Sequence, residues 1–211
     1  AEQLGINPGY LIPAFEDPWL ALDQESRLPT NVDPLGEDLD KPEVRGTLAR
    51  KLRQGLGETS GYVLPLKAAK EGKTVIWRSS LWPLKHERLY LLPGDSPMGL
   101  RLPLASLPWV APEDFEVELP KDPFEKVEPL DTASVRKTRK ITELKKNPSP
   151  KEVIHTALAM EIRKGILFIF MPPVNELEAW LDLVNAIEAT AQKLKLPIRL
   201  EGYAPPRDER L

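Results

Sequence analysis

Frequent proline is the sequence feature that most constrains the strands and loops of this chain. There are 23 prolines among its 211 residues, about twice the usual share of ~5%. They are scattered among apolar segments and do not form P-x-x-P repeats. Because proline lacks a backbone N–H and fixes φ, it interrupts helices and is confined to the ends, edges or bulges of sheets. The pattern predicts short strands and loops punctuated by proline.

Composition narrows the class of protein. Hydrophobic residues make up 41% of the chain and charged residues 29%, which is typical of a soluble globular protein. No apolar run approaches the ~18 residues of a membrane span. The absence of cysteine excludes disulfides, thiolate metal sites and a cysteine nucleophile, and it fits a cytoplasmic location. A net charge of −3 argues against nucleic acid or an anionic membrane as partner.

The first half of the chain is predicted to combine helices with an antiparallel meander. Helices are expected within 13–28, opening at Pro13 or Pro18, and within 41–55, where Asp40 can cap. Short β-prone runs follow, separated by Gly, Pro and Asp. These runs are 62–66, 74–78, 88–92 and 100–104. Residues 1–110 are therefore expected to form a helical part plus a β meander.

Segregated charge marks the middle of the chain. Acidic residues dominate 113–131 and basic residues dominate 136–146. Such blocks contain few core residues, which is typical of a linker or insertion. We predict a domain boundary within 111–150.

Residues 151–211 are predicted to form a β-β-α-β unit. Two strands flank the turn at Arg163–Gly165, a helix spans about 174–194, and a last strand covers 197–203. The expected apolar stripe of the helix consists of Leu177, Trp180, Leu181, Val184, Ile187, Ala191 and Leu194. The predicted fold class is α+β, a mostly antiparallel sheet with packed helices. The start Ala1–Gly5 lacks Met and a signal-peptide pattern, so we expect a fragment of a larger fold.

The segment 93–104, PGDSPMGLRLPL, is the first candidate for a functional site. It lacks the lysine of a phosphate-binding P-loop and leads into a β-prone run, and it does not match the serine nucleophile elbow. One interpretation is a strand connection in which Asp95 hydrogen-bonds the turn. The other makes Asp95 a polar site residue and Arg101 a clamp for phosphate or carboxylate, because guanidinium presents a fixed fork of donors.

Two glutamates lie near predicted strand ends. Glu161 shares a strand face with Arg163 by alternation, and Glu201 ends the last apolar run. Each can be a hairpin-end surface charge. Alternatively, carboxylates on adjacent strands of one sheet face can hold Mg²⁺ near phosphates.

Five blocks of the sequence carry a family resemblance. They are 12–35, 55–66, 93–110, 156–173 and 196–211, with the wording IPAFEDPWLALDQESRLPTNVDPL, GLGETSGYVLPL, PGDSPMGLRLPLASLPWV, TALAMEIRKGILFIFMPP and LPIRLEGYAPPRDERL. Together they resemble the C-terminal region of very large bacterial proteins that begin with a transglutaminase-like domain. That region is classed as a family of putative amidoligases, distantly similar to glutamine-synthetase-like carboxylate–amine ligases.

The resemblance implies an ATP-dependent ligase that joins a carboxylate to an amine of a peptide or amino acid. The matching polar positions are Asp95, Arg101, Glu161, Arg163 and Glu201. It implies catalytic roles for Arg101, Glu161 and Arg163, a cofactor-binding role for Asp95, and Mg²⁺ binding by Glu161 and Glu201. Mg²⁺ and ATP are the implied cofactors, and the remaining domains of the same large polypeptide are the implied partners. Because members continue past the last block, the fragment is expected to be inactive alone.

The alternative function is a non-catalytic module. It would bind a peptide or protein for the transglutaminase-like domain, or serve only a structural role. Convergence of Asp95, Glu161, Glu201 and Arg101 on one concave sheet face would favour catalysis.

Overall fold

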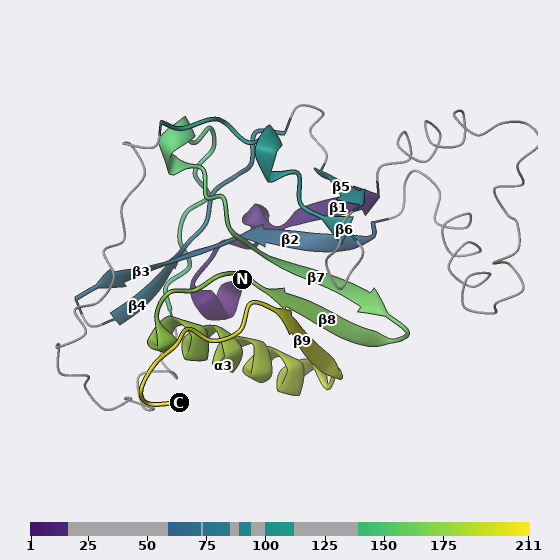
Figure 1. The fold of residues 1–211 in the computed structure, drawn as a ribbon, viewed down its shortest axis with the longest axis vertical. Helices are drawn as coiled ribbons and strands as arrows, with labels where there is room; N and C mark the ends of the chain where they lie inside the picture. The colour runs from purple at the N-terminus through teal and green to yellow at the C-terminus, as the bar shows by residue number, and fades with distance from the viewer. Residues whose placement is uncertain (17–58, 73, 85–88, 94–99, 112–138) are drawn as a thin grey trace, which may run out of the picture.

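The computed structural model describes residues 1–16, 59–72, 74–84, 89–93, 100–111 and 139–211. Their framework is a seven-stranded sheet in the order β6-β5-β1-β2-β7-β8-β9, with a separate hairpin β3-β4 (Figure 1). The strands are β1 (Ile12–Glu16), β2 (Gly61–Pro65), β3 (Lys67–Glu71), β4 (Thr74–Arg78), β5 (Leu89–Pro93), β6 (Leu100–Arg101), β7 (Ala157–Arg163), β8 (Ile166–Met171) and β9 (Ile198–Gly202). One long helix, α3 (Leu177–Leu194), packs on this framework.

The sheet is mostly antiparallel, as the sequence predicts. The pairs β1–β2, β2–β7, β7–β8 and β5–β6 are antiparallel, whereas β1–β5 and β8–β9 are parallel. Short 3-10 turns at Glu2–Leu4, Pro8–Tyr10, Leu104–Ser106 and Pro150–Glu152 complete the described elements. The α+β class is therefore confirmed.

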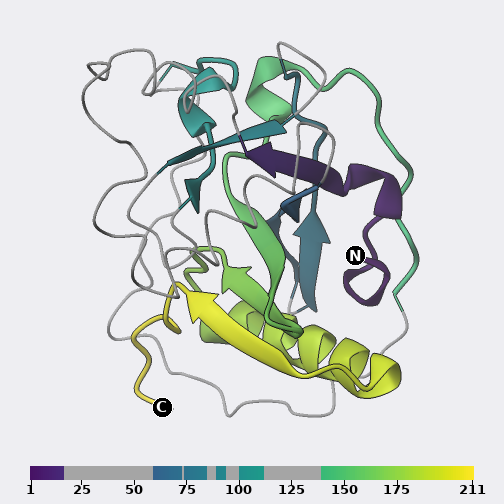
Figure 2. The same cartoon turned by 90° about the vertical axis from the view of Figure 1, so that its right-hand side faces the viewer.

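The C-terminal β-β-α-β unit is also confirmed. β7 and β8 form a hairpin, and α3 connects β8 to β9, which pairs with β8 in parallel. At the hairpin turn Lys164 has φ 51° and Gly165 has φ 76°, the pair of positive angles that a type I′ turn requires. Figure 2 shows α3 and β9 together at one end of the molecule, with β1 in the opposite half.

The first half of the chain differs from the sequence expectation. Residues 12–16 form strand β1 between β2 and β5, so the expected helix does not start at Pro13, while the alternative start at Pro18 lies outside the described residues. Pairing on both sides overrides the local helix signals. The rest of the expected helix at 13–28, and the whole of the one at 41–55, lie outside the described residues. The β-prone runs do form strands, but β2 pairs with β1 and β7, so they do not follow one another as a meander.

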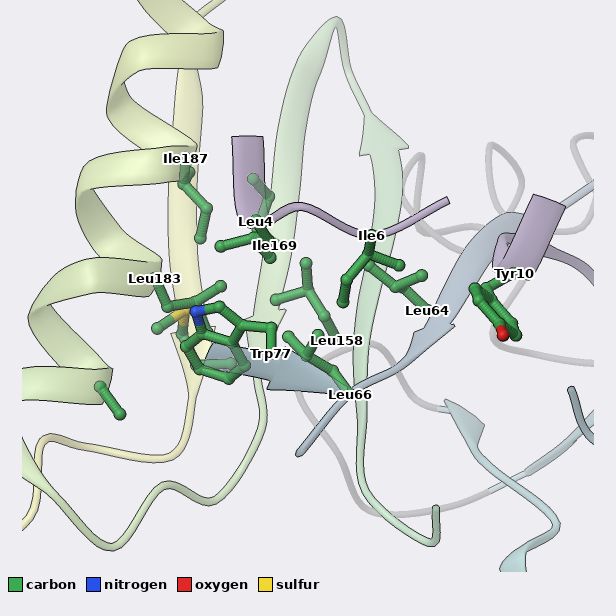
Figure 3. Packing of buried hydrophobic residues seen from close by; sticks show 12 residues of the cluster. Leu4, Ile6, Tyr10, Leu64, Leu66, Trp77, Leu158, Ile169, Leu183 and Ile187 are labelled. Carbon is green, nitrogen blue, oxygen red and sulfur yellow. The ribbon is translucent and has the colours of Figure 1, made fainter. Parts of the chain in front are cut away.

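Two cores lie on opposite sides of the sheet. The first fills the space between the sheet and α3, where Leu183 and Ile187 point toward Leu158 and Ile169 (Figure 3). The second core contains Ala14, Val63, Trp82, Leu89, Leu91, Leu107, Val153, Ala157 and Ala159. Because successive residues of a strand point to opposite faces, β7 contributes Leu158 to the first core and Ala157 and Ala159 to the second.

Part of the charged middle segment packs on the first core. The Arg139 guanidinium donates to both carboxylate oxygens of Asp182 on α3, each at 2.8 Å. Tyr10 donates to the carbonyl of Glu143 and accepts from the backbone N–H of Lys145. Residues 139–150 are thus attached to the domain, while 112–138 lie outside the described residues. The domain boundary within 111–150 stays a prediction, although one sheet takes strands from both flanking segments.

Among the described residues, the structure contains no helix with the length and hydropathy of a membrane span.

Candidate functional site

The face of the sheet opposite α3, here called the distal face, has a floor of small residues. Ala14 of β1, Gly61 of β2, and Ala157 and Ala159 of β7 all line this surface. Their side chains alternate with the larger residues that face α3, such as Leu158. Small side chains on three neighbouring strands leave room above the sheet.

A cavity of about 320 Å³ occupies that room. Its walls are mainly apolar and include Leu91, Leu102, Leu104, Phe170 and Pro172. Polar groups come from Arg101, His155, Thr156 and Tyr203. A mostly apolar hollow with a few convergent polar groups is the usual form of a small-molecule site, and the volume is at the lower end of the ~300–1,000 Å³ such sites occupy.

Gly61 is required by the backbone and also keeps the floor open. A Cβ at this position would lie 2.5 Å from the carbonyl oxygen of Met160, closer than non-bonded atoms approach. Glycine therefore allows β2 and β7 to pair closely. The same absence of a side chain removes an obstacle from the distal face.

A charged cluster lies on the same face. Arg163 Nη2 donates to Glu201 Oε2 at 2.6 Å, and Arg163 Nε lies 3.4 Å from Glu161 Oε2. The Arg163 guanidinium also stacks on Phe168, 3.7 Å from the ring centroid, and Arg199 lies 5.5 Å from the same ring. Glu161 is only 8% exposed. A carboxylate this buried needs a cationic partner, because burying an unpaired charge is very costly.

The cluster borders the cavity. Glu201 lies opposite Phe170 in the β8–β9 register, and Phe170 lines the cavity. The Cα of Glu161 is 3.8 Å from where a Cβ of Gly61 would lie, and Gly61 is part of the floor. The distal face therefore combines Arg101 in the cavity wall with Glu161, Arg163 and Glu201 at its edge.

The outcome for the expected site residues is uneven. Arg163 contacts both Glu161 and Glu201, as alternation along β7 predicts for Glu161. Arg101 is exposed on the short strand β6 and lines the cavity. Asp95 lies outside the described residues.

Mg²⁺ does not fit the two glutamates as they are arranged. Both carboxylates are partners of the Arg163 guanidinium, which takes the position that a cation bridging them would need. Within the described ranges no group of three or more His, Cys, Asp or Glu side chains could hold a metal ion. The arrangement instead fits the positioning of an arginine.

Sequence reasoning missed the cavity floor and the aromatic side chains. Phe168, Phe170 and Tyr203 belong to apolar runs that predict strands but do not indicate which face is covered. The alternation of alanine with large residues in 157–160 is a signal that could have identified the floor. The position of Tyr203 depends on the parallel pairing of β8 and β9, which are separated by a whole helix.

The fold and site define an α+β domain with a small, mostly apolar binding cavity that an arginine-carboxylate cluster borders. Residues 1–211 match the family model described as "Putative amidoligase enzyme (DUF2126)". The chain belongs to this family, which confirms the resemblance to amidoligases seen in the sequence. No curated protein and no solved structure matched the chain.

Proposed function

We propose that this chain takes part in ATP-dependent formation of an amide bond between a carboxylate and an amine of a peptide or amino-acid substrate. Membership of the amidoligase family supports the reaction class. The observation that carries the proposal is the distal-face cavity, which has Arg101 in its wall and Arg163 in the cluster at its edge. Two guanidinium groups beside a small cavity suit a substrate that arrives as a carboxylate.

In this proposal Arg101 binds the substrate carboxylate. A guanidinium offers five N–H donors in a planar fork, so it can hold both carboxylate oxygens and orient the carbon between them. Once the carboxylate has been activated by phosphoryl transfer, Arg101 would also stabilise the negative charge that accumulates on the carbonyl oxygen as the amine attacks and phosphate leaves. Arg101 would thus contribute to both binding and catalysis.

Arg163 is proposed to be held in place by its two carboxylate partners. Glu201 accepts from its terminal nitrogen, Glu161 lies beside Nε, and Phe168 supports the guanidinium plane. Contacts on several sides restrict the rotamers of a long side chain, which reduces the entropy lost when the guanidinium meets an anion. Glu161 and Glu201 are therefore proposed to act as positioning residues.

ATP and Mg²⁺ are proposed as cofactors on chemical grounds. A carboxylate is unreactive toward amines in water, and a nucleotide bound with Mg²⁺ would supply the phosphoryl group that activates it. The assignment of Asp95 as a cofactor-binding residue remains a prediction from the family resemblance, whereas the pairing of Glu161 and Glu201 with Arg163 argues against these two glutamates as the Mg²⁺ ligands. The transglutaminase-like domain of the same polypeptide is the proposed partner.

A binding module without catalysis is the second candidate function. The cavity and Arg101 would serve it equally well, since retaining a carboxylate peptide needs a fitting hollow and a cation but no activated intermediate. The two functions differ in their dependence on nucleotide.

The deciding experiment incubates the natural protein with Mg²⁺·ATP, a panel of short peptides and amine donors, and follows phosphate release together with product mass. Amide product that requires both ATP and Mg²⁺ is expected. Omission of either component should abolish it. Peptide binding without any amide product, over a panel that includes the peptides that bind, would contradict the ligase function and leave the binding module.

A further inference from the structure

The lining of the distal-face cavity determines which carboxylates it can accept. Ala14, Ala157 and Ala159 form its floor, and Leu102, Leu104 and Phe170 belong to its walls. Binding in a cavity with such apolar walls is favourable when an apolar group of the ligand replaces the water inside the cavity. A ligand that has a carboxylate but no apolar side chain would not fill the apolar part of the cavity.

The apolar lining also excludes a second class of substrate. A substrate with an acidic side chain would place a further negative charge inside the apolar walls of the cavity. The loss of hydration of that charge opposes its binding.

We propose that the cavity selects a carboxylate attached to an apolar side chain of about the size of leucine, such as the C-terminal residue of a peptide that ends in an aliphatic residue. Arg101 holds the carboxylate, and the side chain lies over the alanine floor of β1, β2 and β7. This inference rests on the proposed function in taking the occupant to be a carboxylate. It adds the identity of the side chain and rejects acidic substrates.

Calorimetric titration of the natural protein tests the selectivity with four probes: N-acetyl-L-leucine, N-acetylglycine, N-acetyl-L-glutamate and N-acetyl-L-leucinamide. N-acetyl-L-leucine is expected to bind about tenfold or more tightly than N-acetylglycine, since burying a leucine side chain supplies at least that factor. The leucinamide should also bind about tenfold more weakly, because it lacks the charge that Arg101 recognises. Equal affinity for the leucine and glycine probes, or tighter binding of the glutamate probe, overturns the inference.

Two variants locate the selectivity on the distal face. Ala159→Leu fills the floor and should abolish the preference for leucine over glycine. Ala189→Leu makes the same change at an exposed position on α3, outside the cavity lining, and should bind like the wild type. Should Ala159→Leu fail to fold, Tyr203→Ala removes a wall residue that is 58% exposed, and a several-fold weaker binding of the leucine probe is expected. Wild-type selectivity in Tyr203→Ala and in folded Ala159→Leu overturns the inference.

Failure of this inference and failure of the proposed function give different results. Amide formation that uses the glutamate probe in place of the leucine probe overturns the selectivity and leaves the ligase function intact. Selective binding of N-acetyl-L-leucine without amide formation by the same preparation supports the selectivity and contradicts the ligase function.

Discussion

Asp182 is a buried carboxylate on the core side of α3, where hydrophobic periodicity alone would place an apolar residue. It accepts a hydrogen bond of 2.7 Å from Trp77 Nε1 and two of 2.8 Å from Arg139. Arg139 also donates to the carbonyl of Val75 at 3.3 Å. This network joins α3, β4 and the segment 139–150, so a single side chain connects three parts of the domain.

Asp182→Ala should lower the free energy of unfolding by about 3 kcal/mol, because it leaves the partly buried Arg139 charge and the buried Trp77 N–H without their acceptor. Asp182→Asn is the matched control. It keeps a carbonyl acceptor and should cost less. Denaturant unfolding followed by tryptophan fluorescence measures both. Equal midpoints for the wild type and Asp182→Ala would show that the network does not stabilise the fold.

The pKa of Glu152 is changed by contacts at the protein surface. Hydrogen bonds from Lys145 and Ser149 lower the pKa of Glu152 from 4.5 to about 2. Because the folded-state pKa is depressed, these contacts contribute fully above about pH 4.5 and are lost as the pH falls toward 2. An NMR titration of the side-chain carboxyl should find the midpoint near pH 2, and Lys145→Ala should move it upward. An unchanged midpoint in that variant would contradict the assigned cause.

At the scale of elements, two glycines are required for different reasons. Gly165 has φ 76° in the β7–β8 turn, and a Cβ there would meet nothing within 4 Å. Gly61 has no such backbone angle, but its Cβ would lie 2.5 Å from Met160 O. The first position is limited by backbone conformation, and the second by the approach of two strands.

Gly165→Ala should therefore cost about 1–2 kcal/mol, the strain of a left-handed L-residue. Gly61→Ala should cost more, since a clash with backbone in the middle of the sheet forces β2 and β7 apart. Gly72→Ala, with φ 61° and open space, is the control for strain alone. Thermal or denaturant unfolding ranks the three. A Gly61→Ala variant no less stable than Gly72→Ala would indicate that the strands separate without cost.

How far the sequence predicts each element depends on whether its signals are local. The hairpin, α3 and β9 follow from the turn Lys164–Gly165 and from apolar periodicity, and they are confirmed. The predicted apolar stripe of α3 is partly wrong, because Leu183 and Ala179 are more deeply buried than Trp180 or Leu181. The error involves Asp182, whose burial depends on its contacts with Arg139 and Trp77. Because these partners are distant in the sequence, local hydrophobic periodicity does not predict that an aspartate lies on the inner side.

At the scale of the molecule, the distal face could be predicted only in part. Alternation along β7 places Glu161 and Arg163 together, whereas the contact with Glu201 requires the parallel pairing of β9. The position of β1 between β2 and β5 results from long-range strand pairing, which no local sequence pattern predicts. The cavity depends on this pairing, because β1 supplies Ala14 and pairs with β5, which supplies Leu91.

The measurement that tests the account most directly is kcat/KM for amide formation by the natural protein with altered Arg101. Arg101→Gln should lower kcat/KM by about 10²-fold or more, since it removes the charge that meets the substrate carboxylate as the bond forms. Arg101→Lys should recover only part of the loss, because a point charge replaces a bidentate fork. Arg78→Gln, at an exposed position on β4 outside the cavity lining, should match the wild type. Wild-type kcat/KM in Arg101→Gln would contradict the claim that the carboxylate reacts on the distal face.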